Sequence, residues 1–192
     1  DLVAGKEHSI VVNYTSATPG GNHTQTFALP DAEAPIALDT GDFNGDGFAD
    51  LAVGSPFSLP DGGAGEEDGE LFVYYGASTG LDPSAYDAFP GPVGAAHSYG
   101  YYIGGLNMNG DGAADLLVDD AISGNKLQVL YGSSAGLTTT GATDFPIKNV
   151  TGIAVGDING DGRPDLVVGS GDAGKSKTKD HGEVFVGSEG VL

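Results

Sequence analysis

The sequence predicts an all-β chain built from repeated units of four antiparallel strands. Two short signatures recur along its 192 residues. The first reads DFNGDGFADLAVG at Asp42, NMNGDGAADLLVD at Asn107 and DINGDGRPDLVVG at Asp157. The second follows each copy, as FVYYGASTGL, QVLYGSSAGL and EVFVGSEGVL. Internal repeats of this length are typical of solenoids and propellers, so the repetition decides the fold class.

The spacing of the repeats favours a β-propeller. The N-terminus carries a truncated copy, in which DLVAG matches the tail of the first signature and IVVNYTSATPG matches the second. The closing aspartates of the first signature are therefore Asp1, Asp50, Asp115 and Asp165, which lie 49, 65 and 50 residues apart. This period suits a propeller blade of four strands.

Short runs of β-branched and aromatic residues supply the strands of each blade. In the first full copy, IALDTGDF predicts the first strand, ADLAVGSP the second, GELFVYYG the third and residues 85–93 a weaker fourth. Apolar residues nowhere recur at helical spacing for long enough to predict an amphipathic helix. The first copy lacks its first strand and the last copy stops after its third, which predicts fourteen strands in all.

We expect a single β-propeller region over residues 1–192. It would comprise a partial blade over 1–34, full blades over 35–94 and 95–148, and a partial blade over 149–192. These amount to about three and a half blades, either part of a larger ring or a small closed ring of four. An open propeller leaves unpaired strand edges, which invite pairing with another chain. We therefore expect another protein chain, or a second copy of this one, to complete the propeller.

The first signature places oxygen atoms on alternate residues of a tight loop. Side chains at loop positions 1, 3 and 5 can converge on one point, and glycine at position 6 permits the sharp bend. The carbonyl at position 7 and the carboxylate at position 9 would close the cage. Cages made only of oxygen select hard cations, and Ca²⁺ above all. The predicted ligands are Asp42, Asn44, Asp46, Asp50 and the Phe48 carbonyl in the first loop, Asn107, Asn109, Asp111, Asp115 and the Ala113 carbonyl in the second, and Asp157, Asn159, Asp161, Asp165 and the Arg163 carbonyl in the third.

Three calcium sites are thus predicted, and the Asn107 site should be the weakest because it has one carboxylate fewer. Two other loop types are rejected. An EF-hand needs a glutamate at position 12 and flanking helices, whereas position 12 here is Val53, Val118 or Val168 within a predicted strand. A dockerin-type loop is rejected for the same reason, because no helix is predicted beside these loops. The remaining alternative is that Asp, Asn and Gly serve only as turn formers.

The charge of the chain excludes two classes of partner. Acidic residues outnumber lysine and arginine by 27 to 7, and the formal net charge is −20 at pH 7. Nucleic acid and anionic membranes would repel such a chain, whereas cations would be attracted. No apolar run reaches the length of a membrane span, so we expect no membrane insertion. The start at Asp1, without methionine or a hydrophobic leader, predicts a processed product or a piece of something longer.

The paired signatures resemble the FG-GAP repeat, the blade of the integrin α-subunit β-propeller and of many secreted bacterial proteins. DFNGDGFADLAVGSP with FVYYGASTGL carries the resemblance. HSYGYYIGGLNMNGDG is similar to the family's Phe-Gly turn, with Tyr99-Gly100 in its place, and VGSP at Val53 stands for Gly-Ala-Pro. The first and third copies lack a clear Phe-Gly, and the second and third lack the Gly-Ser/Ala-Pro. The resemblance implies calcium on the loop between the first two strands and an extracellular or cell-surface location. Complete rings of the integrin type have seven blades, so the chain would form about half of one.

These observations predict a calcium-stabilised extracellular module for binding, adhesion or assembly, with a protein or glycan ligand. One alternative is a propeller-borne, lyase-like enzyme acting on polysaccharides, or its accessory module. Another is a structural subunit of an extracellular assembly. We expect no catalysis by this chain, because eight carboxylates are assigned to calcium and most of the others lie in predicted turns. The histidines, His8, His23, His97 and His181, have no motif-spaced partners.

Two further segments leave alternatives open. The basic run KSKTKDH from Lys175 and the acidic run DGGAGEEDGE from Asp61 lie in equivalent loops, where opposite charges could guide a contact between chains. Otherwise both runs are simply solvated. Tyr99, Tyr101 and Tyr102 could form a stacking platform for sugar rings, or else pack in the core.

Overall fold

A computed structural model describes residues 2–6, 9–15, 21–30, 35–59, 68–92, 99–120, 126–147, 149–171 and 181–185. These residues form fourteen strands and no helix. The strands are β1 (Leu2–Lys6), β2 (Ser9–Tyr14), β3 (His23–Ala28), β4 (Ala37–Gly41), β5 (Asp50–Ser55), β6 (Glu70–Tyr74), β7 (Tyr86–Pro90), β8 (Ile103–Leu106), β9 (Asp115–Asp120), β10 (Lys126–Tyr131), β11 (Thr138–Phe145), β12 (Val150–Gly156), β13 (Asp165–Ser170) and β14 (His181–Phe185). The prediction of an all-β chain is confirmed.

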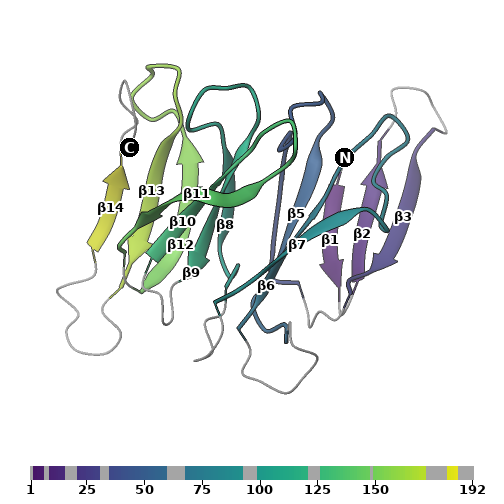
Figure 1. Cartoon of the computed structure of the whole chain (residues 1–192), viewed down its shortest axis with the longest axis horizontal. Helices are drawn as coiled ribbons and strands as arrows, with labels where there is room; N and C mark the ends of the chain where they lie inside the picture. The colour runs from purple at the N-terminus through teal and green to yellow at the C-terminus, as the bar shows by residue number, and fades with distance from the viewer. Residues whose placement is uncertain are drawn as a thin grey trace.

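The described strands pair into four antiparallel sheets that follow the chain order. The sheets are β1-β2-β3, β4-β5-β6-β7, β8-β9-β10-β11 and β12-β13-β14. They hold three, four, four and three strands, as the repeats predict, and none of them closes on itself. Figure 1 shows them side by side, from the N-terminal sheet on the right to the C-terminal sheet on the left. The blade boundaries expected at residues 34, 94 and 148 lie outside the described residues and stay predictions.

Each acidic loop connects the first two strands of its sheet. The pairs Gly41↔Asp50, Leu106↔Asp115 and Gly156↔Asp165 end the ladders of β4 with β5, β8 with β9, and β12 with β13. The loop residues lie between the two members of each pair. The position-9 aspartate is therefore the first residue of the second strand in each sheet.

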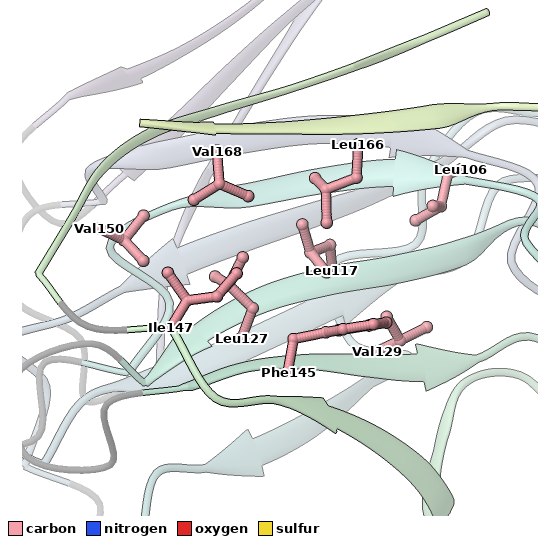
Figure 2. Close-up of a cluster of buried hydrophobic side chains, with 9 residues drawn as sticks. All are labelled: Leu106, Leu117, Leu127, Val129, Phe145, Ile147, Val150, Leu166 and Val168. Carbon is pink, nitrogen blue, oxygen red and sulfur yellow. The ribbon is translucent and has the colours of Figure 1, made fainter. Parts of the chain in front are cut away.

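The core lies between neighbouring sheets, and β5, β6 and β9 are buried on both faces. In β5, Leu51 and Val53 pack toward the first sheet, while Ala52 packs toward the third. The same alternation recurs in β9 and builds a further cluster between the third and fourth sheets. Figure 2 shows this cluster, whose members are Leu106, Leu117, Leu127, Val129, Phe145, Ile147, Val150, Leu166 and Val168. Near-continuous apolar runs are what strands covered on both faces require.

Main-chain hydrogen bonds and close packing at Tyr99-Gly100 join the second and third sheets. Tyr99 forms a β-bridge with Gly69, and its N–H donates to the Asp68 carbonyl (3.1 Å). Gly54 approaches so closely that a Cβ there would lie 2.0 Å from the Gly100 carbonyl oxygen. Tyr99 is only 3% exposed. It therefore packs in the core and cannot offer its face to a sugar, which leaves Tyr101 and Tyr102 of the suggested platform.

A buried carboxylate supports the same turn from the end of β9. Asp119 is 1% exposed, and its Oδ1 accepts a hydrogen bond from the Tyr102 N–H (2.8 Å). Burial raises the pKa of the Asp119 carboxyl to about 7, against hydrogen bonds from the Tyr102 and Tyr101 main chain, and the charge of Asp120 adds to the rise. The carboxyl is thus preferentially protonated in the folded chain. Its favourable contribution to stability is complete below pH ~4 and is lost as the pH rises to about 7.

Asp119→Asn is expected to remove this pH dependence. Measured against the wild-type chain, the free energy of unfolding of the variant should rise by about 2–3 kcal/mol between pH 5 and pH 8. Urea unfolding at both pH values, in the same calcium concentration, gives the comparison. Asp82→Asn is the control, since Ser84 hydrogen bonds lower the pKa of the exposed Asp82 and it does not titrate in this range. If the free energies of unfolding of Asp119→Asn and the wild type differ by the same amount at pH 5 and pH 8, the prediction is contradicted.

Candidate metal-binding loops

Two glycines with positive φ bend each acidic loop. They lie at loop positions 4 and 6, with φ of 69° and 90° in the first loop, 71° and 101° in the second, and 78° and 85° in the third. Residues with a Cβ rarely adopt this left-handed region. The sequence reasoning assigned the bend to position 6 alone. The signal for position 4 was present, because Gly45, Gly110 and Gly160 occupy it in all three copies.

The bend brings the oxygens of the first loop onto shared main-chain donors. The Asp46 N–H donates to both Asp42 Oδ1 and Asn44 Oδ1, each at 3.0 Å. Asp42 Oδ2 accepts from the Gly47 N–H (2.9 Å), and Asp46 Oδ1 accepts from the Phe48 N–H (2.9 Å). The predicted ligand oxygens at positions 1 and 3 therefore meet at a single amide.

The third loop repeats this arrangement and the second loop departs from it. In the third, the Asp161 N–H donates to Asp157 Oδ1 (3.1 Å) and Asn159 Oδ1 (2.8 Å), and Asp157 Oδ2 accepts from Gly162. In the second, Asn107 has only one side-chain oxygen, which accepts from the Gly110 N–H (2.8 Å). The departure falls on the residue that distinguishes the second loop in sequence.

The position-9 aspartate is buried and holds the loop against the rest of the sheet. Asp50 is 1% exposed, and its Oδ2 accepts from the Phe43 N–H (2.7 Å) while Oδ1 accepts from the Gly76 N–H (2.8 Å). Asp115 receives equivalent bonds from Met108 (2.7 Å) and Gly132 (3.0 Å). Burial raises the pKa of both carboxyls, and these main-chain bonds oppose the rise.

Gly76 and Gly132 support the position-9 aspartates, and the sequence analysis did not single them out. Each follows the third strand of its sheet and donates to the position-9 aspartate. A Cβ on Gly76 would lie 2.2 Å from the Ala49 carbonyl oxygen, and one on Gly132 would lie 2.1 Å from that of Ala114. The invariant glycine of the second signature was the available signal. The two signatures are therefore in direct contact.

The donor set of each loop fits a hard cation. Within the described ranges, no three Asp, Glu, His or Cys side chains gather as a metal-binding group by themselves. Each loop instead combines carboxylate and asparagine oxygens with the main-chain carbonyl of Phe48, Ala113 or Arg163, all of them oxygen donors. Positions 1 and 3 converge in the first and third loops, while the position-9 oxygens are turned toward main-chain amides.

The charged runs and the histidines noted in the sequence are only partly described by the structure. Residues 61–67 and 172–180, which carry most of the oppositely charged runs, lie outside the described residues, as do His8 and His97. His23 is described and exposed, and its ring stacks on Tyr14 with 4.5 Å between centroids. Lys126 pairs with Asp144 at 2.8 Å on the third sheet.

Comparison with protein-family models addresses the repeats directly. A model of the FG-GAP repeat matches residues 34–74, which contain the first loop. A model of the FG-GAP-like repeat matches residues 107–168, which contain the second and third loops. The chain belongs to the FG-GAP repeat family of β-propellers. The resemblance read from the sequence is therefore confirmed.

Curated relatives of this FG-GAP chain include integrin α subunits and a phospholipase. It is 41% identical over 91 residues to integrin alpha-7 of Rattus norvegicus, covering 46% of this chain and 7% of the relative. It is 38% identical over 81 residues to integrin alpha-E of Mus musculus, covering 41% and 7%. It is 30% identical over 177 residues to phosphatidylinositol-glycan-specific phospholipase D of Bos taurus, covering 80% and 20%. The FG-GAP chain thus spans a fifth or less of the length of these relatives.

No segment of the described residues forms a helix long and apolar enough to cross a membrane.

Proposed function

We propose that the chain is a calcium-stabilised extracellular propeller module for adhesion-type binding or assembly. The observation that carries the proposal is the convergence of the position 1 and 3 oxygens on one amide, as at Asp46. Membership of the FG-GAP family and the integrin α relatives support the extracellular location and the adhesion role.

The ion would be held by the loop residues already named. In the first loop these are the side chains of Asp42, Asn44, Asp46 and Asp50 with the Phe48 carbonyl, and the second and third loops offer the equivalent sets. Calcium supplies positive charge that offsets repulsion among the carboxylates, so that metal binding and folding are coupled. The chain itself contributes the bend at the paired glycines and the main-chain bonds that fix Asp50.

The phospholipase D relatives favour a second candidate function. They match 80% of the chain in the bovine protein, more than any integrin match reported above. A propeller that accompanies the catalytic part of a larger enzyme would show this pattern without itself being catalytic. An assay of the isolated chain for hydrolysis of a phosphatidylinositol-glycan separates the two possibilities. No turnover is expected if the chain only accompanies a catalytic part, whereas turnover would show catalysis by its own residues.

Completion of the propeller by another chain remains part of the proposal. Light scattering after gel filtration, in calcium and again in chelator, tests it. A dimer or larger species that dissociates on chelation would support completion between chains. A monomer of 19.2 kDa under both conditions would contradict it.

Asn107→Asp is expected to raise the calcium affinity of the second loop. The substitution gives this loop the carboxylate that Asp42 and Asp157 supply in the others, and adds an oxygen that can accept from Gly112 as Asp42 does from Gly47. We expect an affinity gain of about tenfold at that site. Calorimetric titration of the metal-free chain with calcium measures it.

Asn149→Asp is the matched control for this substitution, because it adds the same charge at an exposed residue outside the loops. An equal gain in both variants would show a general charge effect rather than a ligand at position 107.

A further inference from the structure

A hollow of about 270 Å³ lies between the first and second sheets, beside the first acidic loop. Its lining comes from Tyr14 and His23 of the first sheet, from Phe48 and Ala49 of the acidic loop, and from the turn of residues 76–81. Phe48 is a predicted metal ligand only through its carbonyl, so its side chain is available to the hollow. No other predicted ligand lines it.

One wall of the hollow is a fixed pair of aromatic rings. His23 stacks on Tyr14 with an interplanar angle of 15°. The Tyr14 hydroxyl donates to Gln25 Oε1 (2.8 Å) and accepts from the Leu81 N–H (2.9 Å). Gln25 Nε2 in turn donates to the Leu81 carbonyl (3.0 Å). This network orders the Tyr14 ring, and the exposed His23 ring lies against it.

The turn that faces this wall is shaped to approach it. Gly80 has a φ of 99°, and a Cβ there would lie 2.9 Å from the Tyr14 hydroxyl oxygen. The exposed residues Ser78 and Thr79 precede it and bring hydroxyl groups to the lining. The hollow thus combines aromatic surface with neutral hydrogen-bonding groups.

Phe48 adds a third aromatic ring, and it has no equivalent in the other loops. It is 42% exposed, a high value for a phenylalanine side chain. The same loop position holds Ala113 in the second copy and Arg163 in the third. An exposed phenylalanine at this copy alone is not required by the loop geometry, which all three copies share.

We propose that this hollow binds one ring of a neutral sugar. Aromatic faces pack against the C–H faces of a pyranose ring, and the hydroxyls of Ser78 and Thr79 can exchange hydrogen bonds with sugar hydroxyls. The volume lies near the lower end of small-ligand sites, about 300–1,000 Å³, which suits a single ring. The net charge of −20 disfavours an acidic sugar. This inference rests on the proposed binding-module role and names its ligand, but it does not require calcium in the first loop.

Titration of the calcium-loaded full chain with neutral trisaccharides tests the proposal. The probes are trisaccharides of glucose, mannose, galactose and N-acetylglucosamine, with trigalacturonate and a proline-rich peptide as the competing classes. The readout is the ring C–H signals of His23 in NMR spectra, assigned by their loss in His23→Ala. We expect a saturable shift with at least one neutral trisaccharide, at a Kd of about 0.1–1 mM, equivalent to roughly 4–5.5 kcal/mol.

Phe48→Ala and His23→Ala should each weaken this affinity at least about tenfold. Because His23→Ala removes the NMR signal used as the readout, calorimetry measures the affinity of that variant. Tyr86→Ala is the matched control, as it removes an aromatic ring of β7 that is 37% exposed and lies outside the hollow. Its affinity should equal that of the wild type, and equal weakening by Tyr86→Ala would overturn the proposal. So would the absence of any shift up to about 20 mM neutral sugar, or binding of trigalacturonate or peptide alone.

A thermal melt of the same samples in calcium and in chelator reports separately on the metal loops. A calcium-stabilised chain that binds no neutral sugar would reject this ligand and leave the calcium proposal standing.

Discussion

Removal of calcium by a chelator is expected to lower the melting temperature of the chain by about 10 °C or more. With a Kd near ~0.1 mM for the first and third loops, ~2 mM calcium stabilises each by roughly 1.8 kcal/mol, and a tenfold weaker second loop brings the sum to about 4 kcal/mol. The physical cause is the crowding of Asp42, Asp46 and their equivalents around one point, which is unfavourable without a cation. Thermal unfolding followed by circular dichroism, with and without chelator, measures the shift.

Magnesium provides the control for this experiment. At the same concentration, Mg²⁺ should restore little of the lost stability, because it requires octahedral coordination and its hydration shell is costly to remove. Asp161→Ala should reduce the calcium-dependent shift by about two fifths, as one of the two stronger loops is lost. An identical melting temperature in calcium and chelator would show that these loops are turns without a metal.

Gly76→Ala and Gly132→Ala are each expected to destabilise the chain by about 3 kcal/mol or more. The added methyl group would lie 2.2 Å from the Ala49 carbonyl oxygen or 2.1 Å from that of Ala114. These are main-chain atoms beside the first residues of β5 and β9, so relief requires movement of the strand. The same movement disturbs the amide that serves Asp50 or Asp115. Urea unfolding in calcium measures the loss.

Gly152→Ala is the matched control. Gly152 lies in β12, has no positive φ, and a Cβ there would meet nothing within 4 Å. Its substitution should change stability by less than about 1 kcal/mol. Similar losses in all three variants would indicate a general cost of replacing glycine, and would contradict the role assigned to Gly76 and Gly132.

The repeats made most of the fold predictable. Strands β4 to β7 fall within the four segments expected for the first full copy, because apolar runs bounded by turn residues mark strands covered on both faces. The placement of the acidic loops between first and second strands also followed from the order of the signatures. Family membership, fold class and the position of the loops therefore agree with the sequence interpretation.

Features that depend on contacts distant in sequence were not predictable in this way. The raised pKa of Asp119 arises from burial at the turn of Tyr101 and Tyr102, which no local pattern indicates. The hollow joins Tyr14 and His23 to Phe48 and Gly80, parts of two different sheets. The core position of Tyr99 was one of two alternatives, and only the packing between sheets decided between them.

The two main-chain hydrogen bonds of the position-9 aspartate have a consequence for how repeats of this kind can be duplicated. Asp50 draws one amide from Phe43 and the other from Gly76, at opposite ends of the segment that holds both signatures. A gene duplication that copied the loop without the glycine would leave one carboxylate oxygen buried without that donor, at a cost of about 1–3 kcal/mol. The smallest unit that can be duplicated without this penalty runs from the loop to the glycine that follows the third strand. Selection on duplicated copies would then keep the two signatures together along the chain.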